Sequence, residues 1–111
     1  MKIPFCLPLI DNDVISEVND IFTNTGWLTS GPKVRLFEEK IQKKFSLNNF
    51  SAVTNGTIAL QVAIKALDLK GEIITSPFSW IATVSAIKYE KCTPVFCDIN
   101  ENTFNIDPDK I

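Results

Sequence analysis

The strongest structural signal in this chain of 111 residues is the stretch Val53-Thr54-Asn55-Gly56-Thr57-Ile58-Ala59-Leu60. Residues 50–54 predict a short strand, Asn55-Gly56 ends it, and a helix over 57–67 follows at once. That helix is apolar nearly all round, so it is expected to be buried on most sides. A strand that turns sharply into a buried helix is typical of α/β folds.

The first turn of the predicted helix is a candidate anion site. The first N–H groups of a helix have no partner inside it, and the helix dipole adds positive charge there, so this end suits a phosphate. Gly56 lets the backbone approach the anion closely, and the hydroxyl of Thr57 adds a donor. The same residues also fit an ordinary helix cap formed by Asn55 or Thr57. The pattern leaves both interpretations open.

The rest of the second half alternates strands and helices. The pattern predicts a strand over 72–75, a helix over 80–90, a strand over 94–99 and a helix start at Asp107-Pro108-Asp109. Short links between such elements predict parallel pairing. Three strands cannot cover both of their faces with the helices present, so the chain is expected to be the front part of a larger enzyme.

The first half is organised differently. An extended arm over 1–10 precedes two amphipathic helices, over 12–23 and 33–45, and Gly26 is the expected end of the first. The sequence therefore predicts an arm and two helices over 1–46, followed over 47–111 by the start of an incomplete α/β domain.

Two tryptophans lie beside polar turns. Ser76-Pro77-Phe78-Ser79-Trp80 follows a predicted strand, and ligands of open α/β sheets bind beyond the carboxyl ends of the strands. The ring of Trp80 can stack on a planar ligand there, or it can pack in the core. Trp27 and Thr29 lie in the loop over 26–32, which is either a pocket lining or a simple turn between helices.

The composition excludes several classes of protein. The net charge is -2 and no basic patch is present, which argues against nucleic acid and against an anionic membrane as partners. Three sparse cysteines without any histidine argue against a disulfide framework and a zinc site, and reduced thiols fit a cytoplasmic location. No signal peptide or membrane span is expected. Histidine is also absent as a general base within this chain.

Several blocks of the sequence, taken in order, resemble one family. They are Ile3-Pro4-Phe5, Gly26-Trp27-Leu28-Thr29-Ser30-Gly31-Pro32, Phe37-Glu38, Thr54-Asn55-Gly56-Thr57-Ile58-Ala59-Leu60, Glu72-Ile73-Ile74-Thr75-Ser76-Pro77-Phe78-Ser79-Trp80-Ile81-Ala82-Thr83, Thr93-Pro94-Val95-Phe96-Cys97-Asp98-Ile99 and Asn105-Ile106-Asp107-Pro108. The chain resembles the amino-terminal part of the pyridoxal-phosphate-dependent sugar aminotransferases of the DegT/DnrJ/EryC1/StrS family. The match covers nearly the whole chain, and no G-x-G-x-x-G pattern supports a Rossmann-type alternative.

The resemblance implies a fold and a site. The fold is the α/β large domain of fold-type I transferases, with a mostly parallel sheet, flanking helices and active sites shared across a homodimer. Gly56 and Thr57, with Asn55, would contact the phosphate of pyridoxal 5'-phosphate, and Trp80 would stack on its ring. The family transfers an amino group, usually from glutamate, to a nucleotide-linked keto-sugar. Here a dTDP-4-keto-6-deoxyhexose is expected, for polysaccharide or O-antigen synthesis.

The resemblance also implies what these 111 residues do not carry. In the family, the aspartate that pairs with the pyridine nitrogen and the lysine that binds the cofactor covalently lie downstream of the position of residue 111. No catalytic residue is therefore assigned, and the 111-residue chain by itself is expected to be inactive. The alternative is a non-catalytic module that binds a phosphate or nucleotide, or an interaction fragment.

Overall fold

The computed structural model of the chain describes residues 6–111. They form two compact units, of which the first ends at Ala52 and the second is Val53–Ile111. The Ile3-Pro4-Phe5 block and the first half of the predicted arm lie outside the described residues. Between residues 6 and 111, no helix has the length and apolar character that crossing a membrane requires.

The first unit begins with helix α1, Asn12–Asp20, which continues as a π-helical turn, Ile21–Thr25. The Asp11 side chain caps α1 by accepting the N–H of Val14 at 3.0 Å. Gly26 ends the helix in the left-handed conformation, at φ +64°, and its N–H donates to Ile21 O, five residues back, at 2.8 Å. The predicted helix over 12–23 is confirmed, with a wider last turn than predicted.

Helix α2, Pro32–Phe45, confirms the second predicted helix. It begins after Gly31, with Pro32 in the first turn, where its missing N–H costs nothing. Lys33 forms ion pairs with Glu17 and, at 3.0 Å, with Asp20, and these join α2 to α1.

The strand predicted over 50–54 is wrong. Among residues 6–111 the sheet holds two strands, and neither pairs with this segment. The N–H of Ala52 donates instead to a carboxylate oxygen of Glu38 at 2.8 Å, and the ring of Phe50 packs edge-on against Phe37, with 6.1 Å between the ring centroids. A strand needs a neighbouring strand for its backbone groups, and here a side chain of α2 satisfies one of them.

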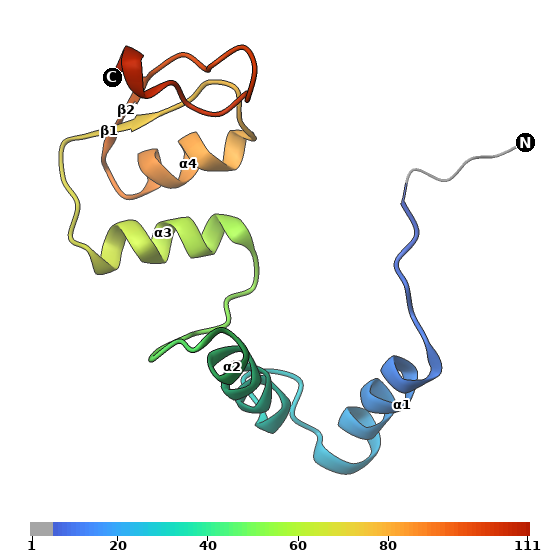
Figure 1. Ribbon diagram of the computed structural model, residues 1–111. Coiled ribbons are helices and arrows are strands. Elements are labelled where there is room, and N and C mark those ends of the chain that lie inside the picture. The colour runs from blue at the N-terminus through green and yellow to red at the C-terminus, as the bar shows by residue number, and fades with distance from the viewer. Residues whose placement is uncertain (1–5) are drawn as a thin grey trace, which may run out of the picture. The chain divides into compact units, whose positions relative to one another are not determined.

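The second unit contains two parallel strands and their helices (Figure 1). The elements are α3 (Gly56–Ala66), β1 (Glu72–Thr75), α4 (Ile81–Tyr89), β2 (Thr93–Phe96) and the short 3-10 helix η2 (Pro108–Lys110). In the sheet, Glu72 lies opposite Thr93 and Thr75 opposite Phe96, which confirms the predicted parallel pairing. Strand β2 is shorter than the predicted strand, because the chain turns away after Phe96.

Helix α4 packs against α3 on one side and against both strands on the other (Figure 1). The core accordingly centres on Ala86 and Ile87 of α4, which are 0% and 3% exposed, with Ile64 of α3 and Cys92 beside them. Contact on two sides explains why α4 is apolar nearly all round.

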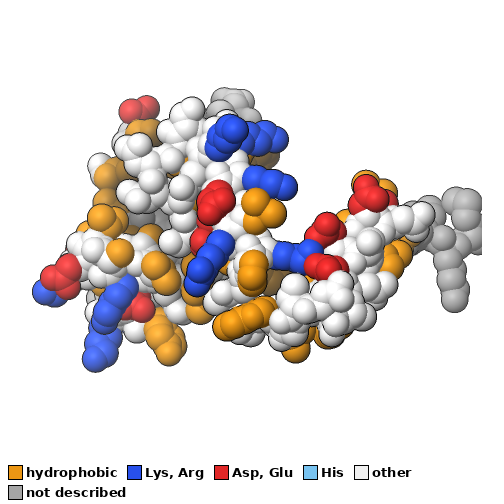
Figure 2. Space-filling view, turned by 90° about the horizontal axis from the view of Figure 1, so that it is seen from below, with side chains coloured by type: hydrophobic (Ala, Val, Ile, Leu, Met, Phe, Trp, Pro, Cys, Tyr) orange, Lys and Arg blue, Asp and Glu red, His pale blue; other side chains and the backbone are white. Residues whose placement is uncertain are grey.

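Helix α3 is covered on one side only, by α4. The prediction that it is buried on most sides is therefore wrong for the described residues: Ile64 is its one buried residue, while Leu60 is 41% and Val62 51% exposed. Figure 2 shows hydrophobic side chains at several places on the visible surface.

Both α3 and α4 end in the same hydrogen-bonded motif. The residue after each C-cap, Asp68 after Leu67 and Lys91 after Glu90, has a left-handed backbone, with φ +49° and +63°. The N–H of Leu69 then bonds Ile64 O at 3.2 Å, and α4 closes in the same way at 3.1 Å. Glycine is the usual residue at this position, because a Cβ is strained there.

The chain after β2 forms a closed segment over residues 98–107. Ile99 and Ile106 form an antiparallel bridge, and the N–H of Asp107 donates to Asp98 O at 3.0 Å. Asp107 then caps η2 through the N–H of Asp109 at 3.1 Å. The helix start predicted at Asp107-Pro108-Asp109 is confirmed as a single 3-10 turn.

Candidate functional site

The first turn of α3 carries free hydrogen-bond donors. Asn55 is its cap, because its side-chain oxygen accepts the N–H of Ile58 at 3.0 Å. The N–H groups of Gly56 and Thr57 have no acceptor anywhere in residues 6–111, and the hydroxyl of Thr57 has no partner there either. The ordinary cap and the anion site therefore coexist, since the cap uses one donor and leaves three for a ligand.

The packing inside the chain leaves room for a side chain at Gly56. Its backbone is helical, and a Cβ added there would meet nothing within 4 Å. A glycine within a helix costs about 1 kcal/mol relative to alanine. The packing within residues 6–111 therefore does not require a glycine at this position.

Trp80 lies on the surface, so the core interpretation of this residue is wrong. It precedes the first turn of α4, where its carbonyl accepts the N–H of Thr83 at 3.0 Å, and it is 79% exposed. With Pro77, Phe78 and Ser79 it lines a shallow hollow of about 310 Å³. The indole is thus free to stack on a planar ligand.

The fold places these two features at one end of the second unit. Helix α3 packs on α4, and Figure 1 shows the first turns of both helices at the same end. The phosphate-type donors of Gly56 and Thr57 and the ring of Trp80, which the sequence singled out separately, therefore share one end of the helix pair.

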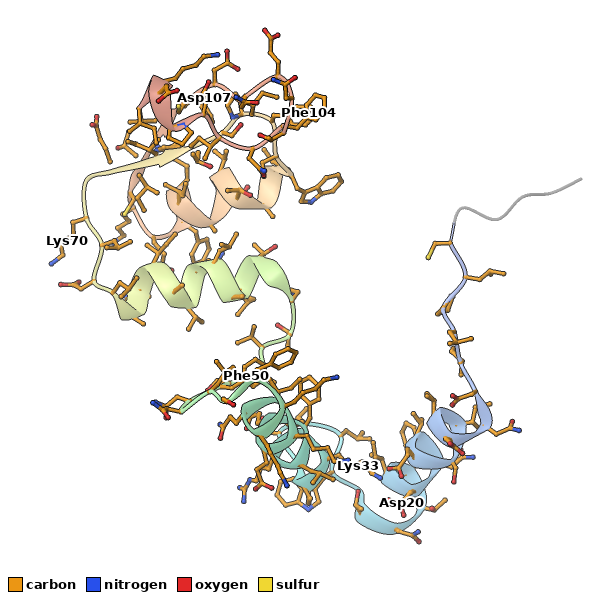
Figure 3. All side chains as sticks on the ribbon, in the orientation of Figure 1. Asp20, Lys33, Phe50, Lys70, Phe104 and Asp107 are labelled. Carbon is orange, nitrogen blue, oxygen red and sulfur yellow. The ribbon has the colours of Figure 1, made fainter. Side chains whose placement is uncertain are left out.

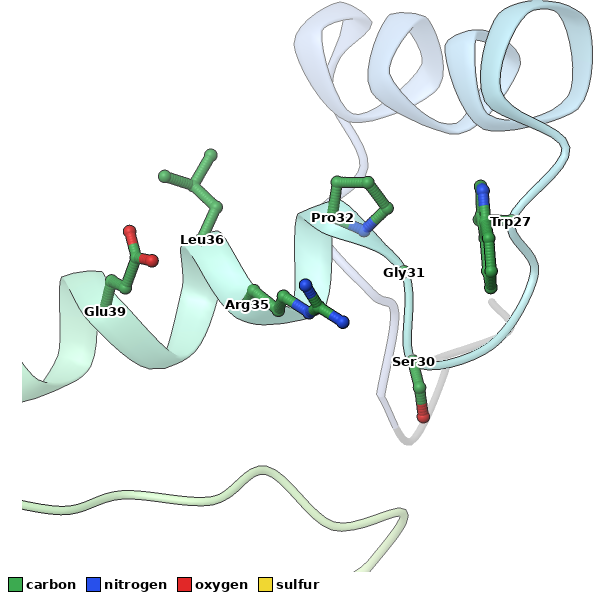
Figure 4. Close-up of a pocket in the computed structure, with 7 residues that line it drawn as sticks. All are labelled: Trp27, Ser30, Gly31, Pro32, Arg35, Leu36 and Glu39. Carbon is green, nitrogen blue, oxygen red and sulfur yellow. The ribbon is translucent and has the colours of Figure 1, made fainter.

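Trp27 lines a separate pocket of about 330 Å³ in the first unit (Figure 4). Ser30 and the first two turns of α2 complete its wall. A Cβ on Gly31 would lie 2.7 Å from Cβ of Trp27, so the loop can close against the tryptophan only with glycine at that position. Thr29 belongs to the same loop but does not line this pocket.

Arg35 and Glu39 also line this pocket, and the sequence reasoning missed both. Arg35 is the single arginine of the chain and forms no ion pair within residues 6–111. Lys33, by contrast, is engaged: the carboxylates of Glu17 and Asp20 raise its pKa. The sequence feature that could have indicated Arg35 is its position, as the single arginine, one turn after Gly31-Pro32.

The family model of the DegT/DnrJ/EryC1/StrS aminotransferase family matches residues 8–111 of the chain. The chain belongs to this family. The chain is similar to the spore coat polysaccharide biosynthesis protein SpsC of Bacillus subtilis, with 41% identity over 111 residues, covering 98% of this chain and 28% of the relative. The dTDP-4-amino-4,6-dideoxy-D-glucose transaminase of Escherichia coli is 44% identical over 86 residues, covering 77% of this chain and 23% of the relative.

The three-dimensional comparison agrees with the family. A putative sugar aminotransferase of Streptococcus pneumoniae, Spr1654, in its PLP form, superposes with a TM-score of 0.90 and 31% identity, over 98% of this chain and 28% of that chain. The expected α/β fold with parallel strands and flanking helices is confirmed. The chain spans about a quarter of the length of the relatives it matches.

Proposed function

We propose that this chain forms the phosphate and ring contacts of the pyridoxal 5'-phosphate site in a sugar aminotransferase. The single observation that carries the proposal is the shared end of α3 and α4, where free donors and an exposed indole occur together. The cofactor of the family has both a phosphate and an aromatic ring, so one ligand would use both features.

The first turn of α3 would hold the phosphate. The N–H groups of Gly56 and Thr57 and the Thr57 hydroxyl donate to its oxygens, and the absent Cβ of Gly56 leaves room for it. Asn55 fixes the helix start through its bond to Ile58, and its amide nitrogen adds a further donor. The Asn55 cap already holds the backbone that carries these donors, so binding costs little conformational entropy.

Trp80 would orient the ring. An indole stacked on the pyridine would fix the ring plane, and one backbone hydrogen bond, from the N–H of Thr83 to Trp80 O, holds the tryptophan before α4. Bound pyridoxal phosphate supplies the electron sink that amino-group transfer needs. This chain's own residues bind and orient the group.

The amino acceptor would be a nucleotide-linked keto-sugar of the dTDP-4-keto-6-deoxyhexose type, and the donor glutamate. The Escherichia coli relative carries a dTDP-linked sugar in its name, which supports this class. In the Trp27 pocket, the guanidinium of Arg35 suits a diphosphate and Trp27 suits a flat base, with Thr29 as a neighbouring contact. The complete enzyme would act as a cytoplasmic homodimer in polysaccharide synthesis.

Pyridoxine 5'-phosphate tests the cofactor contacts, because it lacks the aldehyde that reacts with lysines. We expect saturable shifts of the Gly56 and Thr57 amide resonances on titration. Thr57→Val should raise the dissociation constant about 10- to 150-fold, since a hydrogen bond to a charged group is worth about 1.5–3 kcal/mol. Trp80→Ala should raise it about two- to tenfold.

Two matched variants serve as controls. Thr93→Val makes the same change at the amino end of β2, and Trp27→Phe changes the other tryptophan; neither should alter the dissociation constant. If Thr57→Val and Trp80→Ala behaved like these controls, the proposed site would be wrong. Binding of a nucleotide in preference to pyridoxine 5'-phosphate at Gly56 would favour the non-catalytic alternative.

A further inference from the structure

Phe104 is an exposed aromatic residue in a strained conformation. Its backbone has φ +58°, a left-handed value that costs a non-glycine residue free energy, and its side chain is 61% exposed. Burial in a core therefore does not offset the strain. Such positions persist where the surrounding structure holds them, and they gather at functional sites.

The surrounding hydrogen bonds explain how the strain is held. The N–H of Phe104 donates to Asn100 O at 2.9 Å, and the N–H of Asn100 donates to Asn105 O at 2.9 Å. These bonds lie inside the bridge between Ile99 and Ile106. The 98–107 segment is thus a closed loop that presents Phe104 on its surface (Figure 3).

The ring of Phe104 reaches the loop that carries Trp80. It packs on Phe78 with 5.9 Å between the ring centroids and 33° between the ring planes. Phe78 itself is 65% exposed and lies two residues before Trp80. An aromatic contact at this separation is favourable. Because both rings remain largely exposed, the contact adds little to the core, and its effect is to join the two loops that follow the carboxyl ends of β1 and β2.

The other restraints on this loop are local. Ser76 Oγ accepts the N–H of Phe78 at 3.1 Å, and the hydroxyls of Ser79 and Thr83 lie 2.9 Å apart. The second bond joins the end of the loop to α4, as does the bond from the N–H of Thr83 to Trp80 O at 3.0 Å, and all of these bonds span at most four residues. Phe104 provides the contact from a distant part of the chain, 26 positions after Phe78 along the printed sequence.

We propose that Phe104 is a positioning residue for Trp80: through its ring contact with Phe78 it fixes the Ser76–Trp80 loop, and so the direction in which the indole is presented. The importance of that direction for the cofactor ring rests on the function proposed above. The positioning itself concerns only this chain and is measurable without any ligand.

The experiment separates the ring from the backbone strain. Phe104→Ala removes the ring and keeps a Cβ in the strained conformation, Phe104→Gly removes both, and Phe104→Tyr keeps the ring. Tyr89→Ala, at the far end of α4 and 74% exposed in the parent, is the control for loss of an aromatic side chain in the same unit. The readout is the heteronuclear 15N NOE of the Phe78 and Trp80 amides, which reports picosecond-to-nanosecond motion.

We expect lower NOE values at Phe78 and Trp80 in both Phe104→Ala and Phe104→Gly, with parental values in Phe104→Tyr and Tyr89→Ala. The dissociation constant for pyridoxine 5'-phosphate should rise about two- to fivefold in the first two variants only. Parental NOE values in Phe104→Gly, whose backbone is relieved of strain, would overturn the inference. If NOE values fell as expected while Trp80→Ala left binding unchanged, positioning would stand and the proposed cofactor role of Trp80 would fall.

Discussion

The carboxylate of Asp98 lies 3.2 Å from the ammonium group of Lys110, and it also accepts the N–H of Ile99 at 2.8 Å. The N–H of Ile99, and after it Lys110, hold the pKa of Asp98 below its ordinary value of 3.8. The pair ties the start of the 98–107 segment to the 3-10 turn that follows it. A lowered pKa means that the stabilisation is complete above pH 3.8 and is lost as the pH falls through the lower folded-state pKa.

The first prediction is that Asp98 titrates below 3.8 in the folded chain and that Lys110→Met moves its midpoint upward, but not fully to 3.8. The shift is incomplete because the N–H of Ile99, the larger cause, remains. Carboxyl 13C chemical shifts measure the midpoint directly. Lys70→Met, which removes the 2.9 Å ion pair to Asp68, is the matched control and should leave Asp98 unchanged. An Asp98 midpoint at or above 3.8 in the parent would contradict the geometry.

The second prediction is that Gly56→Ala stabilises the chain and weakens phosphate binding together. The added methyl group meets no neighbour, so α3 gains about 0.4–1 kcal/mol in local stability, which amide hydrogen exchange within α3 measures. The same methyl group intrudes where a phosphate must approach, and Gly56→Val should weaken pyridoxine 5'-phosphate binding further. Gly71→Ala makes an identical change at φ +82° and should destabilise. Unaltered ligand binding in Gly56→Val would remove Gly56 from the site.

The third prediction is that Lys91→Gly stabilises α4. Lys91 has φ +63° in the closing motif and forms no ion pair within residues 6–111, so glycine relieves strain of about 1 kcal/mol. Amide hydrogen exchange of the α4 core, read at Ile87, measures the gain. Lys88→Gly, three residues earlier and inside the helix, should instead destabilise by about 1 kcal/mol. A slower exchange in both variants, or in neither, would not fit this account.

The signals that predicted structure correctly are local ones. Asp11 before an amphipathic run, Gly26 after it and Pro32 at the next helix start each act on backbone within a few residues, so the chain alone specifies them. The same holds for Asp107 before Pro108.

The errors concern contacts with distant partners. Residues 50–54 have the composition of a strand, yet no neighbouring strand receives them within residues 6–111, and a Glu38 oxygen takes one of their N–H groups instead. Likewise α3 has apolar residues on all sides, but only α4 covers it.

The candidate site also combines local features, which the sequence predicts, with features that depend on distant contacts, which it does not. The free donors at Gly56 and Thr57 were predictable, because every helix begins with unpaired N–H groups. The exposure of Trp80, the pocket beside Arg35 and the left-handed backbone of Phe104 depend on how separate segments pack, and residue types alone do not encode them.

The fourth prediction follows from the exposed apolar surface. In the 111-residue chain, Trp80 and Ile81 are 79% and 69% exposed, and Val62 of α3 is 51% exposed. The chain should therefore bind a hydrophobic dye such as ANS and unfold with low cooperativity. Calorimetry and dye fluorescence test this, and Val62→Lys should reduce dye binding without loss of helix signal. Sharp, cooperative unfolding with no dye binding would count against it.

The fifth prediction is that the 111-residue chain does not by itself transfer amino groups. Transamination needs a lysine that binds the cofactor and moves a proton, and a carboxylate beside the pyridine nitrogen. The family resemblance implies that the anchoring lysine lies downstream of residue 111, so none of the ten lysines here is expected to serve. After borohydride reduction in the presence of pyridoxal phosphate, mass spectrometry should show no single preferred lysine. Specific labelling of one lysine, or glutamate-dependent amination of a nucleotide keto-sugar, would refute the prediction.

The contact between α3 and α4 has a consequence for the size of ligand that this end of the chain can accept. Gly56 begins one helix and Trp80 precedes the other, so in the proposed site the spacing of the two helix axes would set the distance between the phosphate and the ring of the bound molecule. Ala86 has no exposed surface, and it clusters with Ile64 across that contact. A larger side chain at position 86 would push the helices apart and lengthen that distance, so the small size of Ala86 would limit the length of ligand that the proposed site accepts.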